Sequence, residues 1–373
     1  MHERTIPTLE TRIARLGVAL EPSGVPEDVE GVLNPASARS RDGVLLLYPR
    51  CVARGNVSRI GIFESSGSQD GSSPGGAAFA PLGYALEPQE AYEFRDVPGG
   101  YGCEDPRVTF LPLLDAYVMA YTAFGPTGPR IALAISPDGY VWERLGPVDF
   151  SAPGLPHGDD KDAAFFPEPV LSPTGVPSFA FYHRPMLHVS AVDGRSAVPI
   201  ILALPPHERE STRIAYVPLE AVLRDRRNLL KVAESTIVLA PGEGWGRIKT
   251  GGGTPPVRID EGWLSFFHGV DALSDADGTV TGMRYSAGLV IHDFERPDRV
   301  LYRSSEPVFY PETSDELRGM VNNVVFPTAI DAVANAGPRD FDVYYGMADS
   351  RIGLLRARVG ESEAAGASAE TAA

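Results

Sequence analysis

The chain has 373 residues, enough to bury a large core, and this length allows two domains or one large all-β domain. The formal net charge of −16 argues against a nucleic acid or an anionic membrane as partner, because binding to either requires a basic surface. Only Cys51 and Cys103 are present, which excludes a disulfide framework and a cysteine-based zinc site.

The N-terminal segment, residues 1–30, is predicted to be a short helical extension. Ile13, Leu16, Val18 and Leu20 recur among charged residues between positions 3 and 20, a pattern typical of an amphipathic helix. No charged start followed by an apolar run precedes it, and the chain contains no long uncharged apolar segment. We therefore expect an unexported, cytoplasmic protein.

Residues 31–359 read as short strands separated by turns. The chain contains 39 glycines and 34 prolines, and apolar runs such as 44–48, 58–63, 117–123 and 130–136 end at Gly, Pro or Asp. Without alternating helices, this pattern favours an all-β sandwich, barrel or propeller. Residues 65–77 are predicted to form a flexible loop, and residues 360–373 a disordered tail.

Two adjacent acids, Glu104 and Asp105, precede Pro106 and Arg107 at the start of an apolar run. Pro106 is expected to push Asp105 towards extended backbone geometry and so to fix the direction of its carboxylate. The segment is either a turn with a surface ion pair or the site of a general acid. The neighbouring Cys103 is interpreted as a packing residue rather than a nucleophile.

Five basic residues in the next part of the chain are candidates for holding an anion. Lys161 either neutralises the acids around it or converges with His183 and Arg184 on a phosphate or carboxylate. Arg130 and Arg144 flank a predicted hairpin and add two more cations. In so acidic a chain, a basic cluster at one place would indicate an anion site.

Aromatic and polar residues towards the C-terminus suit a sugar. Trp263 and His268 lie at the two ends of one apolar run, although a histidine in a strand is more often a hydrogen-bonded core residue. Asp349 follows another apolar run, where it either holds a sugar hydroxyl or caps a turn. No HExxH, Cys/His metal spacing, GxSxG or P-loop motif is present, so we expect no metal site.

Together these motifs resemble those of glycoside hydrolase family 130, the β-mannoside phosphorylases. The resemblance runs from about Asn34 to about Arg358 and keeps the family's motif order. It rests on residues 104–107, 130–134 with 142–146, 161–168, 183–185, 254–270, 323–327 and 344–349.

The resemblance implies a single five-bladed β-propeller and inverting phosphorolysis of a terminal β-linked mannose, which gives α-mannose 1-phosphate. Asp105 matches the general acid, acting through the mannose 3-hydroxyl, and phosphate replaces the activated water of ordinary inverting hydrolysis. No cofactor other than this co-substrate is implied. The implied phosphate ligands are Arg130, Arg144, Lys161, His183 and Arg184. The implied sugar-binding residues are Asn34, Arg50, Arg59, Glu104, Arg107, Asp162, Trp263, His268 and Asp349.

Two other functions stay open at this point. A β-mannosidase on the same scaffold would lack the phosphate cations and carry a carboxylate base, and the presence of Lys161 and Arg184 argues against it. A non-catalytic glycan-binding propeller would use Trp263, His268 and Asp349 and would still bind sugar without Asp105. The acceptor sugar, the linkage and a possible homo-oligomer are left undetermined by the sequence.

Overall fold

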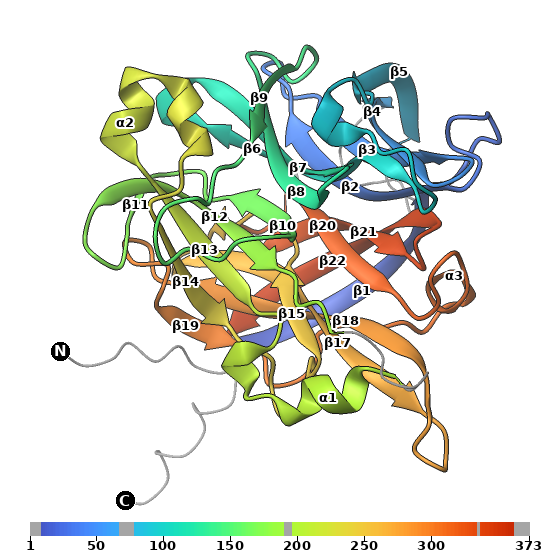
Figure 1. Cartoon of the computed structure of the whole chain (residues 1–373). Coiled ribbons are helices and arrows are strands. Elements are labelled where there is room, and N and C mark those ends of the chain that lie inside the picture. Colours follow the sequence, from blue (N-terminus) through green and yellow to red (C-terminus); the bar gives the residue numbers. More distant parts are fainter. Residues whose placement is uncertain (1–8, 67–77, 190–195, 334–335, 362–373) are drawn as a thin grey trace, which may run out of the picture.

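The computed structural model describes residues 9–66, 78–189, 196–333 and 336–361, and they form mainly β-strands (Figure 1). The all-β prediction is confirmed. The strands of these residues belong to four sheets, and almost all neighbouring strands are antiparallel. The predicted loop 65–77 and tail 360–373 lie largely outside the described residues.

The first sheet has eight strands, which divide into two runs of four. The two runs meet where Val57 and Ser58 pair in parallel with Tyr101 and Gly102. Short 3₁₀ helices, η1 (Ala91–Glu93) and η2 (Pro112–Leu114), precede and follow the strand Tyr101–Leu111 along the chain. The first run is β2 (Gly31–Arg39), β3 (Leu45–Ala53), β4 (Val57–Ser66) and β5 (Ala78–Leu86). The second run is β6 (Tyr101–Leu111), β7 (Ala116–Gly125), β8 (Gly128–Ser136) and β9 (Glu143–Pro147).

Two further sheets follow in chain order, each with four strands in sequence and a short fifth strand at its side. One contains β10 (Asp160–Phe165), β12 (Pro177–Pro185), β13 (Thr212–Pro218) and β14 (Glu234–Leu239), with β11 (Val170–Leu171) beside β12. The other contains β15 (Lys249–Gly252), β17 (Trp263–Ser274), β18 (Val280–His292) and β19 (Val300–Arg303), with β16 (Val257–Arg258) beside β17. The connections carry α1 (Val198–Ala203), η3 (Pro206–Glu208), α2 (Leu219–Arg224) and η4 (Arg226–Leu230).

The last sheet joins the two ends of the described chain. Its order is β1 (Leu9–Leu20), β22 (Arg351–Glu361), β21 (Asp340–Met347) and β20 (Val325–Ala332), and α3 (Ser314–Leu317) precedes β20. The helix predicted between residues 3 and 20 is therefore wrong for residues 9–20. Glu10, Arg12 and Ala14 are exposed and alternate with more buried neighbours, and backbone pairing with β22 decides for the strand.

The core lies between neighbouring groups of strands. One cluster joins Val118 and Leu133 of the second run to Phe165, Phe179 and Phe181 of the next sheet. A second cluster joins β17 and β18 to β21 and β22. Because the strands of each group pack face to face with the next group, their first strands, β2, β6, β10, β15 and β20, are brought close to one another.

In three of these first strands, the regular pairing with the neighbouring strand is interrupted at an Asn or Asp residue. The pairing register shifts at Asn34, Asp105 and Asp162, whose φ angles are 42°, 48° and 65°. Asn and Asp adopt this left-handed region more readily than other non-glycine residues. The expectation that Pro106 would hold Asp105 extended is therefore wrong, because a bulge sets its backbone instead. The interruptions free these three side chains from the regular alternation of the strands.

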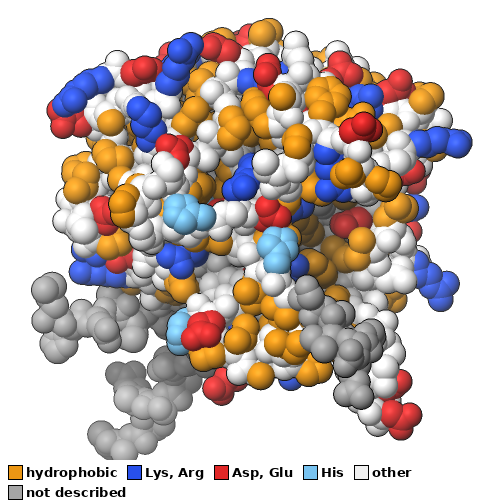
Figure 2. Space-filling model, in the orientation of Figure 1, with side chains coloured by type: hydrophobic (Ala, Val, Ile, Leu, Met, Phe, Trp, Pro, Cys, Tyr) orange, Lys and Arg blue, Asp and Glu red, His pale blue; other side chains and the backbone are white. Residues whose placement is uncertain are grey.

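Acidic and basic side chains are interspersed on the face seen in Figure 2, and that face is hollowed near its centre. Within the described part of the chain, no helix is long and apolar enough to cross a membrane.

Candidate active site

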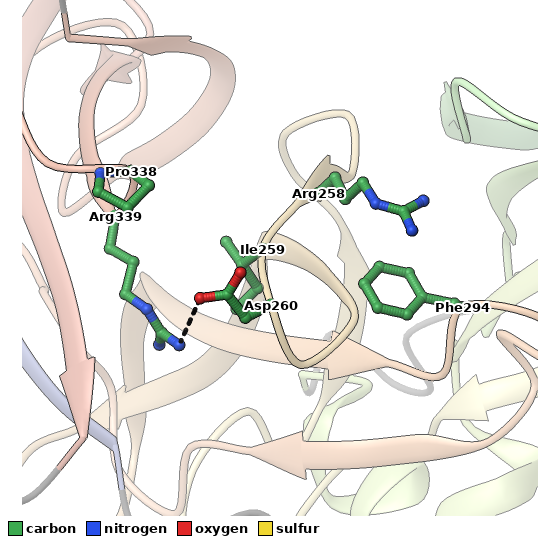
Figure 3. A pocket seen from close by; sticks show the side chains of 6 residues that line it. All are labelled: Arg258, Ile259, Asp260, Phe294, Pro338 and Arg339. Atoms are coloured by element: carbon green, nitrogen blue, oxygen red, sulfur yellow. Dashed lines mark ion pairs between the residues drawn. The ribbon is translucent and has the colours of Figure 1, made fainter.

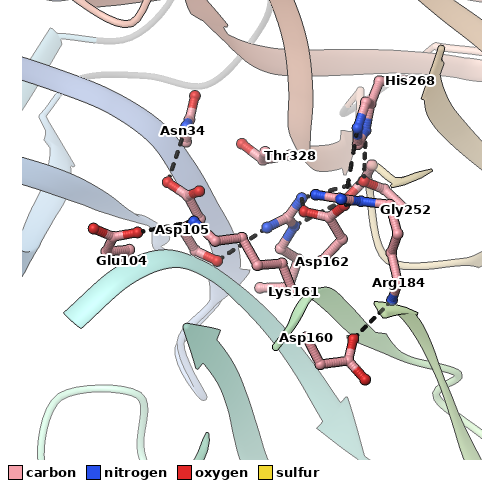
Figure 4. Close-up of polar contacts among 12 residues, drawn as sticks. Asn34, Glu104, Asp105, Asp160, Lys161, Asp162, Arg184, Gly252, His268 and Thr328 are labelled. Carbon is pink, nitrogen blue, oxygen red and sulfur yellow. Dashed lines mark hydrogen bonds and ion pairs between the residues drawn. The ribbon is translucent and has the colours of Figure 1, made fainter. Parts of the chain in front are cut away.

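A cavity of about 210 Å³ lies where the first strands of the groups converge. Its wall brings together residues from sequence motifs that lie up to 315 positions apart, as Figure 4 shows for several of its polar members. It is lined by Asn34, Arg50, Asp105, Lys161, Asp162, Arg184, Met186, Lys249, His268, Tyr285, Val321, Val324, Phe326 and Asp349.

A larger hollow of about 360 Å³ lies elsewhere, beside the β16–β17 turn and the start of β21 (Figure 3). Arg339 in its wall is paired with Glu261 and with Asp260 at 3.8 Å, and Arg258 is paired with Glu168 at 3.1 Å. Each cation there already has a carboxylate partner, and neither Asp105 nor any of the expected phosphate ligands lines this hollow. The smaller cavity is therefore the candidate site.

Two side chains donate hydrogen bonds to the Asp105 carboxylate. Asn34 Nδ2 donates a hydrogen bond of 2.9 Å to Asp105 Oδ1, and Arg50 NH1 donates one of 3.2 Å to the same oxygen. Burial by itself would raise the pKa of Asp105, but Arg50, Lys161 and Arg107 outweigh it and hold the pKa below its ordinary value. The carboxyl is thus ionised in the ligand-free protein.

Glu104 holds two cations at the wall of the cavity. Its carboxylate accepts hydrogen bonds from Arg50 NH2 at 3.0 Å and from Lys161 Nζ at 3.2 Å. Burial would lower the pKa of Lys161, but Glu104 and Asp105 raise it above the ordinary value. Lys161 is therefore a fixed ammonium at the site.

Asp162 and Arg184 form a second buried ion pair. Arg184 Nε donates to Asp162 Oδ2 at 2.6 Å, and Arg184 NH1 donates to Glu210. His268 Nδ1 donates to the Gly252 carbonyl at 3.1 Å. Burial first, and then Arg184 and Lys249, lower the pKa of His268 to about 3, so the imidazole is neutral.

Arg107 holds the backbone of the cavity wall in place through hydrogen bonds to carbonyl groups. It is only 1% exposed and donates to the carbonyls of Asp105, Gly252 and Gly253 at 3.0, 3.3 and 3.1 Å. Its guanidinium also lies 5.0 Å from the centre of the Phe326 ring. Arg107 therefore joins the bulge of β6 to the end of β15 and fixes the two strands relative to each other.

Asp349 follows β21 with a φ of 49° and lines the cavity. Burial, and then the charge of Asp105, raise its pKa from 3.8 to about 6. Unlike Asp105, this carboxyl takes up a proton close to neutral pH.

Asp349→Asn is expected to stabilise the protein at neutral pH. The folded protein keeps a proton on Asp349 that the unfolded chain releases between about pH 4 and about pH 6, so this carboxyl makes folding less favourable as pH rises through that window. Removing it should raise the free energy of unfolding by up to about 2–3 kcal/mol at about pH 8 and by much less at about pH 4. Guanidinium unfolding at both pH values measures this, and an equal gain at both would contradict it.

Comparison with known proteins places the chain in a family. A family model described as beta-1,4-mannooligosaccharide phosphorylase matches residues 223–362. A 1,2-beta-oligomannan phosphorylase of Thermoanaerobacter sp. (strain X514) is 30% identical over 257 residues, which cover 68% of this chain and 67% of that protein. The chain belongs to glycoside hydrolase family 130. The predicted family is thus confirmed.

Solved structures agree on the fold. The beta-1,2-mannobiose phosphorylase of Listeria innocua, in complex with beta-1,2-mannobiose, matches with a TM-score of 0.65 and 21% identity, over 92% of this chain and 96% of that one. A structure reported with the family-130 glycoside hydrolases that target beta-1,2 mannosidic linkages in Candida mannan matches with a TM-score of 0.65 and 19% identity, over 95% of each chain.

Most of the site residues expected from the family-130 resemblance lie at or beside the cavity. Asn34, Arg50, Asp105, Lys161, Asp162, Arg184, His268 and Asp349 line it. Glu104 and Arg107 contact these lining residues. Their roles in binding and catalysis remain predictions.

Two expected phosphate ligands are engaged elsewhere. Arg144, on β9, donates to Glu93 at 2.8 and 3.1 Å, and that carboxylate is fully buried. His183 is fully buried and hydrogen-bonded to Asp160 at 2.7 Å and to Ser235 at 2.7 Å. Both side chains are therefore structural in this arrangement. Neither lines the cavity.

Three more expected residues lie outside the cavity. Arg130 donates to the Gly158 carbonyl, and Arg59 Nε donates to Glu87 at 3.2 Å. Trp263, only 1% exposed, packs in a core cluster and donates to the Phe294 carbonyl at 3.1 Å. The indole cannot serve as a sugar platform at this site, because its faces are covered by protein.

Lys249 and Tyr285 line the cavity but were not expected there. Lys249 directly precedes the Thr250–Thr254 glycine-rich segment, and its Nζ lies 5.3 Å from the centre of the Tyr285 ring. One signal in the sequence could have identified it: the chain has only three lysines, Lys161, Lys231 and Lys249. Two of these three line one cavity. Among the described residues, no group of three His, Cys, Asp or Glu side chains is arranged to hold a metal ion.

Proposed function

We propose that this β-mannoside phosphorylase cleaves its substrate with inversion, using Asp105 as the general acid and a phosphate held by Lys161, Arg184 and Lys249 as the nucleophile. The observation that carries the proposal is that the Asp105 carboxyl and these three cations line one cavity. The glycosidic C–O bond breaks, its electron pair and a proton go to the acceptor oxygen, and a phosphate oxygen bonds to the anomeric carbon. The products are α-mannose 1-phosphate and a shortened acceptor.

The three cations differ in how free they are to bind phosphate. Lys161 already contacts Glu104, and Arg184 contacts Asp162 and Glu210. Within the described residues, Lys249 has no carboxylate partner at ion-pair distance and only approaches the Tyr285 ring. We assign Lys249 the direct charge contact to phosphate, and Lys161 and Arg184 the positioning of its oxygens. Arg130, Arg144 and His183 are left out because their polar groups are engaged away from the cavity.

Asp105 must be protonated before it can act as an acid, although it is ionised in the free protein. A phosphate anion in the cavity places negative charge close to Asp105 and offsets the cations that lower its pKa. Substrate binding thus supplies the condition for Asp105 to take up its proton. Asn34, Arg50, Glu104, Asp162, His268 and Asp349 are proposed to bind the mannose hydroxyl groups, with Arg107 as support.

We also propose that the five groups of four strands are the blades of a β-propeller. The strands of each group follow one another in the sheet, and their first strands surround the cavity. In the fifth group, β1 from the start of the chain pairs with β22 from its end, which would close the ring.

The experiment that tests the function follows phosphate release from α-mannose 1-phosphate in the presence of mannose, glucose, N-acetylglucosamine or β-mannobiose. Release that depends on the acceptor supports the phosphorylase. Hydrolysis of β-mannosides without phosphate would instead identify a hydrolase. Sugar binding without either reaction would identify a glycan-binding protein. The cations in the cavity favour the first outcome over the hydrolase.

Lys249→Met is expected to raise the KM for phosphate about 10- to 100-fold, because it removes a charge-assisted contact to an anion. The KM for the mannoside should change much less. Lys231→Met is the matched control, since Lys231 is exposed and does not line the cavity. Initial rates of phosphorolysis at varied phosphate concentration measure the effect. An unchanged KM for phosphate would show that Lys249 does not contact it.

A further inference from the structure

The segment directly before β15 is held against β17 by three consecutive backbone N–H groups. Gly246 N donates to Asp271 Oδ2 at 2.8 Å, and Arg247 N donates to Asp271 Oδ1 at 3.1 Å. Ile248 N donates to the Val270 carbonyl at 2.9 Å. Asp271, on β17, is only 5% exposed and also accepts a hydrogen bond of 3.1 Å from Arg247 Nε. One buried carboxylate therefore fixes the segment that leads into β15.

Trp245 fixes the same segment by packing. It is 5% exposed, and the centre of its ring lies 5.2 Å from that of the Phe267 ring, with 28° between the two planes. A Cβ atom at Gly269 would lie 2.6 Å from the indole, and one at Gly288 would lie 2.5 Å from it. Because these distances are shorter than a van der Waals contact, glycine at both positions lets the indole lie across β17 and β18. Segment 245–248 is thus anchored both by a side chain and by its backbone.

Lys249, the first residue of β15, follows this segment and pairs with Val270. Within the described residues, no carboxylate lies at ion-pair distance from its ammonium, whereas Glu104 holds that of Lys161 at 3.2 Å. A lysine carries its charge on a flexible stem with many rotamers. The place of the Lys249 ammonium at the cavity therefore depends on the backbone that carries it and on the Tyr285 ring, whose centre lies 5.3 Å from Nζ.

We propose that Asp271 is a positioning residue: by holding the segment before β15, it places the Lys249 ammonium where phosphate binds. This inference rests on the proposed function, in which Lys249 contacts phosphate directly. Asp271 does not line the cavity, so it acts on phosphate through Lys249. Its charge alone would act in the opposite direction, because a carboxylate near an anion site repels the anion. Positioning and simple repulsion therefore predict opposite effects when the carboxylate is removed.

The test is a double-mutant cycle on the KM for phosphate, from initial rates of phosphorolysis of β-mannobiose. Asp271→Asn leaves one accepting oxygen in place of the two of the carboxylate, and its NH2 group meets an N–H donor. It is expected to raise the KM for phosphate about three- to tenfold, the effect of one lost hydrogen bond, and the KM for β-mannobiose by less than about twofold. In the Lys249→Met background, the same substitution should leave the KM for phosphate unchanged or lower it.

Asp340→Asn is the matched control. Asp340 is also 5% exposed and accepts a hydrogen bond from Gly337 N at 3.0 Å and one from Arg358 Nε at 2.6 Å, and it does not line the cavity. The substitution makes the same chemical change in the same kind of contact. Both KM values should stay unaltered.

Trp245→Phe tests the same segment if Asp271→Asn does not fold. The smaller ring still packs against Phe267 but leaves part of the space over the two glycines unfilled, which loosens the segment. The KM for phosphate is expected to rise about twofold or more in this variant, and not to rise in the Lys249→Met background.

Each outcome decides the inference. A rise confined to phosphate and to chains that contain Lys249 supports it. An equal rise in the Lys249→Met background overturns it, because Asp271 would then act by another route. A rise shared by the KM for β-mannobiose or by Asp340→Asn also overturns it, because it indicates a general loss of structure. An unchanged KM for phosphate in Asp271→Asn overturns it and leaves the proposed function standing. A wild-type chain without phosphate-dependent turnover contradicts the proposed function and overturns the positioning role with it.

Discussion

Asp105→Asn is expected to lower the rate of phosphorolysis about 10²- to 10⁴-fold, the usual contribution of a general acid. The amide cannot supply a proton to the leaving oxygen. It can still contact Asn34 and Arg50, which both bond to Oδ1 of Asp105 in the native protein. Asn also tolerates the φ of 48° at this position, so the fold should persist. Phosphate release and α-mannose 1-phosphate formation measure the effect.

A matched control separates the chemistry from the backbone conformation. Asp115 has the same φ of 48°, is exposed at the end of η2 and pairs with Arg41 at 2.7 Å, outside the cavity. Asp115→Asn therefore makes the same chemical change in the same backbone region and should leave the rate unaltered. If Asp105→Asn retains most of the activity while Asp115→Asn behaves as expected, another group must be the acid.

Arg107→Met is expected to lower the free energy of unfolding by about 3–5 kcal/mol, as loss of one member of a buried charged network does. The variant removes the Arg107 donor from the carbonyls of Asp105, Gly252 and Gly253 in a buried region, although the Gly252 carbonyl keeps a second donor, His268 Nδ1. It also leaves Asp162, whose Oδ1 lies 4.0 Å from Arg107 NH2, with one cation fewer. The midpoint of guanidinium unfolding, followed by tryptophan fluorescence, measures the loss.

Arg226→Met is the control for this prediction. Its guanidinium is exposed and pairs with Glu143 at 2.7 Å, and exposed pairs contribute at most about 1 kcal/mol. If Arg107→Met lowers the free energy of unfolding no more than Arg226→Met does, water must satisfy the carbonyls that Arg107 contacts. The bulge of β6 would then not depend on Arg107 for its position.

Local features of the sequence indicated most clearly those residues of the candidate site that stand where a strand is interrupted. Asn34 and Asp105 each precede a proline, and Asp349 ends an apolar run, so each stands where a strand is interrupted. Residues at such interruptions leave the regular alternation and can converge at one place. The expected direction of Asp105 was wrong, because the preference imposed by Pro106 yields to the pairing of β6 with β7.

Basic and aromatic residues were harder to place from the sequence. Arg144 and Lys249 look alike as isolated cations, but Glu93 binds the first and no carboxylate of the described residues pairs with the second. Trp263 was expected beside a sugar because it shares a strand with His268. Five positions separate them, so the two side chains point to opposite faces of β17, and the tryptophan enters the core.

The sequence by itself determined the all-β class, the positions of the turns and the acids and cations of the main motifs, because these depend on the backbone preferences of Gly, Pro, Asn and Asp and on residue type. Only the tertiary structure decided that residues 9–20 form a strand, that Lys249 joins Lys161 and Arg184, and that Arg144, His183 and Trp263 do not. These outcomes depend on partners far away in the chain, such as β22 for β1 and Glu93 for Arg144. The register of strand pairing and the direction of each side chain set those partners, and neither is encoded in a short stretch of residues.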